Sequence, residues 1–143
     1  MNKILIVALM ILCCTSTYAS GVNHAVLVAA AGTPVEKFTN KELRLLYLGY
    51  PVTRGKRRFE PLINQSGEIT YQGFLQKVMF MSKQSYNRKL VTRVFRHGGE
   101  RPPSFQQRGP LIIELKKNTN AITFMMPEVA AGIEGIQVVQ PLW

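Results

Sequence analysis

A short polar turn carries the groups best suited to bind a small ligand, and its residues are Asn64, Gln65, Ser66 and Gly67. The turn lies between an apolar run at residues 59–63, typical of a buried strand, and a helical pattern that starts at Glu68. Such a turn directs backbone N–H groups into open space, with the positive end of the helix dipole behind them. This geometry suits an oxyanion such as phosphate, sulfate or a carboxylate. The alternative is that Ser66 serves only as the N-cap of the helix.

Residues able to perform catalysis or bind a metal are scarce in this sequence. All eight acidic residues are glutamate, so calcium loops and Ser-His-Asp sets are not available in their common forms. Neither His24 nor His97 has an acidic partner at a recognisable spacing, and both cysteines lie close to the N-terminus. We therefore expect no catalysis, no metal site and no cofactor.

The charge balance indicates an anionic partner. Lys and Arg total 18 against 8 Asp and Glu, which gives a formal net charge of +10, and a basic surface raises the local concentration of anions. The alternative for each basic residue is a solvated surface position. Aromatic residues are not interleaved with the basic ones, so nucleic acid is not expected as a partner. The residues expected to form a basic face that supports the polar turn are Arg57, Arg58, Lys89, Arg93 and Arg96.

Residues 1–19 have the features of a secretory signal, because a lysine precedes a short apolar core and residues 17–19 give a small-x-small cleavage site. Cleavage would leave residues 20–143 as a single domain in the periplasm. About 120 residues can bury roughly two-thirds of the unfolded surface, which is enough for one domain. The alternative is a lipoprotein anchored through one of the two cysteines, although neither follows the small residue that this processing usually requires.

Local signals predict three further helices. The first starts with a capping box formed by Thr39 and Glu42. The second starts after Ser82 as its N-cap, and the third covers residues 111–117 with Pro110 at its first position. A buried strand is expected at residues 24–31, and further strands are expected at residues 121–126 and 135–139.

The segment F-T-N-K-E-L-R-L-L-Y-L-G-Y at residues 38–50, with the basic turn and strand after it, resembles the phosphate-type substrate-binding proteins of ABC transporters. Residues 81–103 and 121–126 also resemble this family. The resemblance implies an α/β fold, namely a single lobe of a type II periplasmic-binding-protein-like fold with a small mixed sheet flanked by helices. The matching positions of the first segment are Phe38, Thr39, Glu42, Leu43, Tyr47, Leu48 and Gly49.

The phosphate loop of this family resembles R-x-D-G-S-G-T, and the resemblance places its serine and glycine on Ser66 and Gly67. The family's aspartate, threonine and arginine fall on Asn64, Glu68 and Leu62. Two polar ligands are therefore lost, and the charge of Glu68 would oppose a nearby dianion.

Two functions follow from these observations. The first is an exported solute-binding-like protein that binds phosphate or a similar oxyanion and is related to phosphate ABC transport. The second is a periplasmic interaction or adapter protein that docks onto an envelope membrane protein, such as a transporter or sensor, through its basic helix. A complete binding protein closes two lobes around its ligand, so a homo-oligomer that joins two half-sites is a further possibility.

Overall fold

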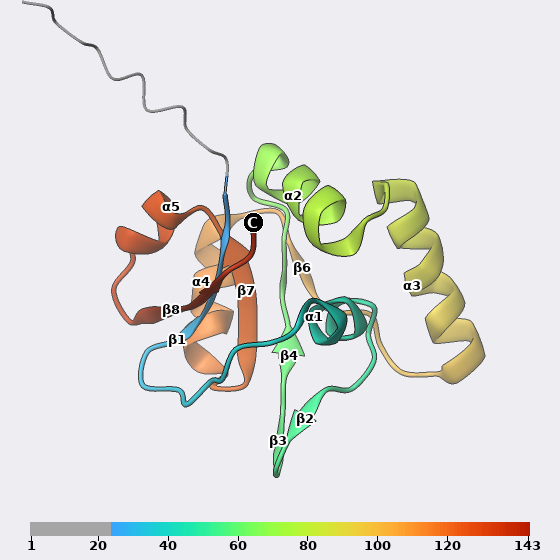
Figure 1. The fold of residues 1–143 in the computed structure, drawn as a ribbon, viewed down its shortest axis with the longest axis horizontal. Helices are drawn as coiled ribbons and strands as arrows, with labels where there is room; N and C mark the ends of the chain where they lie inside the picture. Colours follow the sequence, from blue (N-terminus) through green and yellow to red (C-terminus); the bar gives the residue numbers. More distant parts are fainter. Residues whose placement is uncertain (1–23) are drawn as a thin grey trace, which may run out of the picture.

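The computed structural model describes residues 24–143, so the secretory signal predicted at residues 1–19 lies outside the described residues. The strands of its main sheet are β1 Val26–Ala30, β4 Glu60–Pro61, β7 Ala121–Met125 and β8 Ile136–Pro141. Their order across the sheet is β4-β7-β1-β8 (Figure 1). Strand β1 pairs antiparallel with β7 and β8, whereas β4 runs parallel to β7. The sheet is therefore mixed, as predicted.

Two smaller strand pairs accompany this sheet. Strands β2 Thr53–Arg54 and β3 Arg57–Arg58 form an antiparallel hairpin, and strands β5 Ile63–Asn64 and β6 Ser104–Phe105 run parallel to each other. The strand predicted at residues 59–63 is thus divided between two sheets. The Leu62 amide donates to the Ile122 carbonyl of β7, and the next amide, of Ile63, donates to the Pro103 carbonyl, each at 2.8 Å. The chain changes neighbours at this point, which the apolar pattern alone does not reveal.

Five α-helices and one π-helical turn complete the described residues. The predicted capping box at Thr39 and Glu42 is confirmed, and so is Ser82 as an N-cap, because its hydroxyl accepts from the Ser85 amide at 3.2 Å. The prediction for Pro110 is wrong, because the helix begins two residues earlier, with Gln107 as its N-cap. The helices are α1 Asn40–Tyr47, α2 Glu68–Phe74, η1 Leu75–Met79, α3 Lys83–His97, α4 Arg108–Lys117 and α5 Pro127–Ala131.

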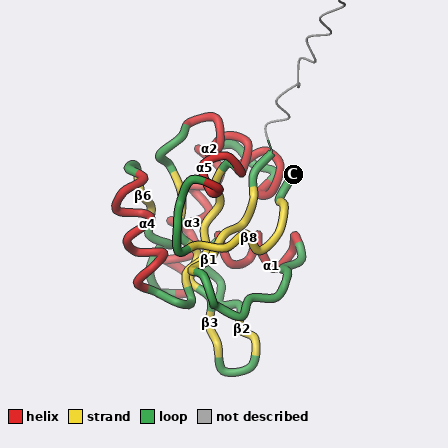
Figure 2. The backbone as a smooth tube through the Cα atoms, turned by 90° about the vertical axis from the view of Figure 1, so that its left-hand side faces the viewer, coloured by secondary structure: helices red, strands yellow, loops and turns green. Residues whose placement is uncertain are grey.

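The sheet is covered by helices on both faces, and Figure 2 shows its strands between α4 on one side and α1 on the other. Alternate residues of β1 explain how this is possible. Leu27 belongs to the buried cluster that includes residues of α1, α2 and α3, whereas Val28 belongs to the cluster that includes residues of α4 and α5. In the first cluster the rings of Phe74 and Phe124 stack with their centroids 3.9 Å apart. A strand buried on both faces gives a continuous apolar run, as the sequence predicted.

Within residues 24–143, no helix has the length and apolar character needed to cross a membrane.

Candidate functional site

The polar turn lies at the edge of the molecule where several parallel strands end. Strand β5 leads into α2, β6 leads into α4, and β7 leads into α5, and all three helices begin near the top of Figure 1. Strands β4 and β7 are parallel to each other, as are β5 and β6, so their carboxyl ends lie on one side. In open α/β sheets this is the side on which ligands bind. The predicted passage from strand through turn to helix is present at residues 63–68.

The structure corrects the assignment of Ser66 as the N-cap of this helix. The N-cap of α2 is Gly67, in an extended conformation with φ −135° and ψ 115°, and no side chain accepts a hydrogen bond from the amides of its first turn. The Ser66 hydroxyl instead donates to Oδ1 of Asn64 at 2.6 Å. Since no side chain caps α2, its first amides point toward solvent or a ligand.

Asn64 is the residue that fixes the shape of the turn. Its side chain is buried, and its Nδ2 donates to the Phe124 carbonyl of β7 at 2.8 Å. Its Oδ1 accepts from both the amide of Ser66, at 3.0 Å, and the hydroxyl of Ser66. This is the side-chain turn for which asparagine is well suited. Asn64 therefore holds the turn against the main sheet, and its amide group is occupied by protein contacts.

The four predicted ligand residues differ in what they offer to a ligand. The Gln65 amide donates to the Phe105 carbonyl of β6 at 2.8 Å, and the Ser66 amide is bound by Asn64. Gln65, Ser66 and Gly67 are all half-buried, so the turn is open to solvent. The groups left to meet an anion are the first amides of α2, beginning with those of Gly67 and Glu68, together with the Ser66 hydroxyl if it rotates away from Asn64.

The structure adds Thr70 to this site. Thr70 is only 8% exposed, and a Cβ placed on Gly67 would lie 3.5 Å from its Oγ1. Its hydroxyl therefore lies beside the open amides and can donate a further hydrogen bond. A sequence signal for this exists, because residues three apart share one side of a helical turn, and Thr70 is three residues after Gly67. That spacing was not used in the prediction.

One negative charge lies beside the turn. The carboxylate of Glu68 is exposed and accepts a hydrogen bond from Nε2 of Gln72 at 2.8 Å, one helical turn further on. This contact directs the carboxylate along the helix rather than across its N-terminus. Burial raises the pKa of the nearby Tyr71 phenol, so this group stays neutral and adds no second negative charge.

The five residues of the predicted basic face lie in two separate regions. Lys89, Arg93 and Arg96 are on α3, whereas Arg57 and Arg58 are in the hairpin at the bottom of Figure 1, at the opposite end from the start of α2. The Arg57 guanidinium donates to the Pro34 carbonyl at 3.1 Å. The five residues expected to form the supporting basic face are therefore divided between α3 and the hairpin. The hairpin contributes to the overall positive charge but lies far from the polar turn.

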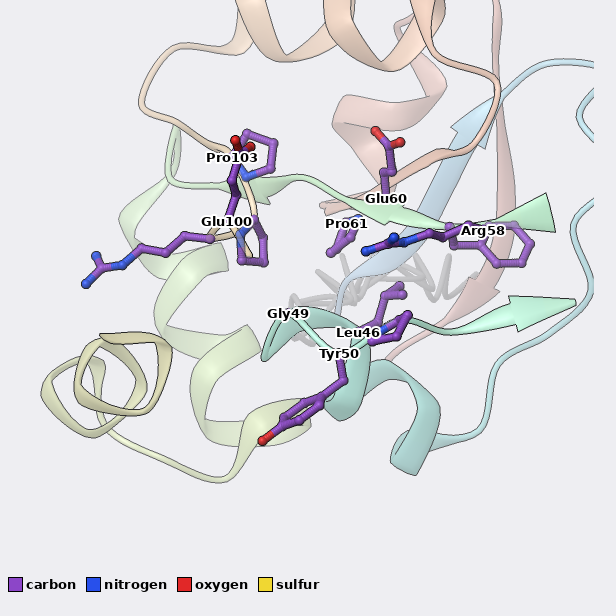
Figure 3. Close-up of a pocket in the computed structure, with 12 residues that line it drawn as sticks. Leu46, Gly49, Tyr50, Arg58, Glu60, Pro61, Glu100 and Pro103 are labelled. Atoms are coloured by element: carbon purple, nitrogen blue, oxygen red, sulfur yellow. The ribbon is translucent and has the colours of Figure 1, made fainter. Parts of the chain in front are cut away.

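Arg58 lines a pocket of about 310 Å³ between the hairpin and the chain that follows α3. Figure 3 shows its side chain extending across this pocket toward Pro61, with Glu60 and Glu100 also in the lining. Glu60 accepts a hydrogen bond from Nδ2 of Asn118 at 2.6 Å. Arg101 also lines this pocket, so two carboxylates and two guanidiniums offset each other and the lining has no net positive charge to attract an anion. In the described part of the chain, no group of three or more His, Cys, Asp or Glu residues could hold a metal ion.

No protein-family model and no curated protein sequence matches the chain. Among solved structures it is similar to an ABC-type phosphate transport receptor from Vibrio cholerae, with a TM-score of 0.57 and 13% sequence identity. The match covers 82% of this chain and 45% of the receptor, so the chain spans less than half the length of that protein. This similarity confirms the predicted fold class, an α/β fold of the periplasmic-binding-protein type with a small mixed sheet flanked by helices.

Proposed function

We propose that the protein binds phosphate or a similar small oxyanion at the turn between β5 and α2, without catalysis, as a solute-binding protein of the periplasm related to phosphate ABC transport. One observation carries this proposal: α2 begins at a half-buried turn, and no side chain caps the amides of its first turn. The similarity of the fold to a phosphate transport receptor supports it. So does the formal net charge of +10.

The proposed contacts are few. The amides of Gly67 and Glu68 would donate to two oxygens of the anion, and the hydroxyls of Ser66 and Thr70 would donate to others. A hydrogen bond to a charged group contributes about 1.5–3 kcal/mol, and the helix dipole adds about 0.3–1 kcal/mol. The loss of translational freedom and the charge of Glu68 oppose these terms. We therefore expect a dissociation constant near 1 mM, which corresponds to about 4 kcal/mol.

The described residues offer one side of a site only, so enclosure of the anion requires a second surface. A homo-oligomer that brings two such turns together would bury the anion and exclude water, which strengthens each charge-assisted hydrogen bond. Under this extension, phosphate affinity rises with protein concentration and the oligomer is stabilised by phosphate. Native mass spectrometry with and without phosphate reports both the oligomeric state and the bound anion.

The test is a calorimetric phosphate titration of the double variant Ser66→Ala/Gly67→Val. Valine readily adopts the extended conformation that Gly67 has, so this variant should fold, but its methyl groups would lie over the amides and against Thr70. A matched control is Ser85→Ala/Gly132→Val, because Gly132 also has a negative φ, −84°, and lies at the far end of α5. We expect phosphate binding to disappear in the first variant and to persist in the control. If both variants bind phosphate equally well, the anion site does not lie at this turn.

A further inference from the structure

A second pocket, separate from the polar turn, lies between the end of α1 and the exposed side of α3. Its volume is about 300 Å³. The chain that follows α1 contributes an apolar and an aromatic side chain, and α3 contributes a row of basic ones. We call it the basic groove, and its principal residues are Leu48, Tyr50, Arg88, Lys89, Arg93 and Arg96.

Arg93 gives the basic groove a fixed shape. Its guanidinium donates to the Gly49 carbonyl at 3.0 Å and to the Gly98 carbonyl at 2.6 Å, which joins the end of α1 to the end of α3. Its Cζ atom also lies 4.8 Å from the centre of the Tyr50 ring. The charge of Arg93 is therefore used inside the protein, where it holds Tyr50 in place. This side of the groove is therefore already ordered before a ligand binds, which reduces the conformational entropy lost on binding.

The other basic side chains of the groove have no acidic partner. Within residues 24–143, the ion pairs are those that Arg54 makes with Glu36 and Glu42, in another part of the molecule. The side chains of Arg88, Lys89 and Arg96 are exposed, and no carboxylate lines the pocket with them. Like charges gathered on one surface repel one another, and this repulsion is relieved when an anionic partner binds.

We propose that the basic groove docks an acidic segment of a partner protein. In this arrangement carboxylates of the segment pair with Arg88, Lys89 and Arg96, and an apolar or aromatic side chain packs against Leu48 and Tyr50. Tyr50 is 37% exposed, so its ring is available for such a contact. The groove thus provides what a specific interface needs, an aromatic anchor surrounded by charged residues that exclude wrong partners.

Other occupants fit the groove less well. A second copy of this chain carries the same net charge of +10, so two copies would repel each other at this surface. Single-stranded nucleic acid needs successive aromatic platforms, and the groove offers only Tyr50 beside His97, with ring centres 6.3 Å apart. A bilayer surface would contact the protruding side of α3 rather than enter a hollow between two elements. The acidic segment therefore remains the best match.

The test uses a fluorescein-labelled peptide in which three glutamates flank a tryptophan on each side. Binding of this peptide to the full chain is measured by fluorescence anisotropy. We expect binding at low ionic strength that weakens as salt is added. Reversing two charges in Arg88→Glu/Arg96→Glu should weaken binding at least about tenfold. The matched control, Lys116→Glu/Lys117→Glu, makes the same change in net charge at the end of α4 and should stay within about threefold of the parent protein.

Two further measurements separate this proposal from its alternatives. Substituting Tyr50→Ala should weaken peptide binding while its salt dependence is preserved, because the aromatic contact is lost and the charges remain. Vesicles containing phosphatidylglycerol and a single-stranded oligonucleotide serve as competing probes. The proposal is overturned if the peptide does not bind, or if both charge-reversal variants weaken peptide binding equally. It is also overturned if either competing probe binds more tightly than the peptide and its binding depends in the same way on Arg88 and Arg96. Peptide binding by Ser66→Ala/Gly67→Val should be unchanged, so failure here and failure at the polar turn are distinguishable.

Discussion

Replacing Asn64 by alanine should destabilise the protein and abolish oxyanion binding together. The substitution removes three hydrogen bonds, the one that Asn64 donates to Phe124 and the two that it accepts from Ser66. Each contributes about 1 kcal/mol net, so the free energy of unfolding should fall by about 3 kcal/mol. For a domain of this size that corresponds to a decrease in melting temperature of roughly 10 °C. A protein with an ordinary stability of about 5–15 kcal/mol stays folded after this loss.

The assay is urea denaturation followed by circular dichroism, with phosphate titration of the folded variant at low temperature. A matched control is Asn118→Ala, because Asn118 also forms a side-chain turn, accepting from the Asn120 amide at 2.9 Å, but its contact with Glu60 is exposed. The control should lose about 1 kcal/mol or less and keep its phosphate binding. If Asn64→Ala is no less stable than the control, or still binds phosphate like the parent protein, the assignment of Asn64 as the support of the turn is wrong.

Two further predictions concern a binding side chain and a helix cap. Thr70→Val keeps the shape of a side chain that is 8% exposed but removes its hydroxyl. Calorimetry should therefore show phosphate binding weakened about three- to tenfold, while urea denaturation shows little change in the free energy of unfolding. Unchanged phosphate affinity would exclude Thr70 from the site. The backbone hydrogen bond from Thr39 holds the pKa of Glu42 below its usual value of 4.5, so Glu42 contributes stability that is present above that pH and is lost as the pH falls through the lowered value. Glu42→Gln should therefore be less stable than the parent protein at neutral pH, and the difference should shrink as the pH falls through the lowered pKa; a difference that does not shrink in acid would contradict this.

The helix N-caps show which features local sequence can predict. The capping box of Thr39 and Glu42 and the cap at Ser82 were predicted correctly because both partners of each contact lie within three residues of one another. The cap predicted at Ser66 was wrong although the local pattern was equally good. Its hydroxyl binds Asn64, whose side chain is oriented by a carbonyl of β7 that lies sixty residues away in the sequence. A local signal therefore fails where a distant strand fixes one of the competing partners.

The two basic regions show that local sequence also fails to predict which surface residues lie together. The sequence shows the number of basic residues and their clusters along the chain, but it does not show which clusters share a surface. The structure places Arg57 and Arg58 in a hairpin and joins Arg93 to Gly49, forty-four residues earlier in the chain. The basic groove therefore exists only because α1 and α3 pack together, and no spacing along the chain describes it.

Local sequence is enough to predict the apolar strands, three helix starts and the position of the polar turn, because these depend on contacts within one or two turns of the chain and on which side chains avoid water. Long-range packing fixes which amides of the turn remain open, how residues 59–63 divide between two sheets, and which charges share a surface. These features depend on packing between segments far apart in the chain, and on the requirement that buried polar groups find a partner wherever the fold brings one near.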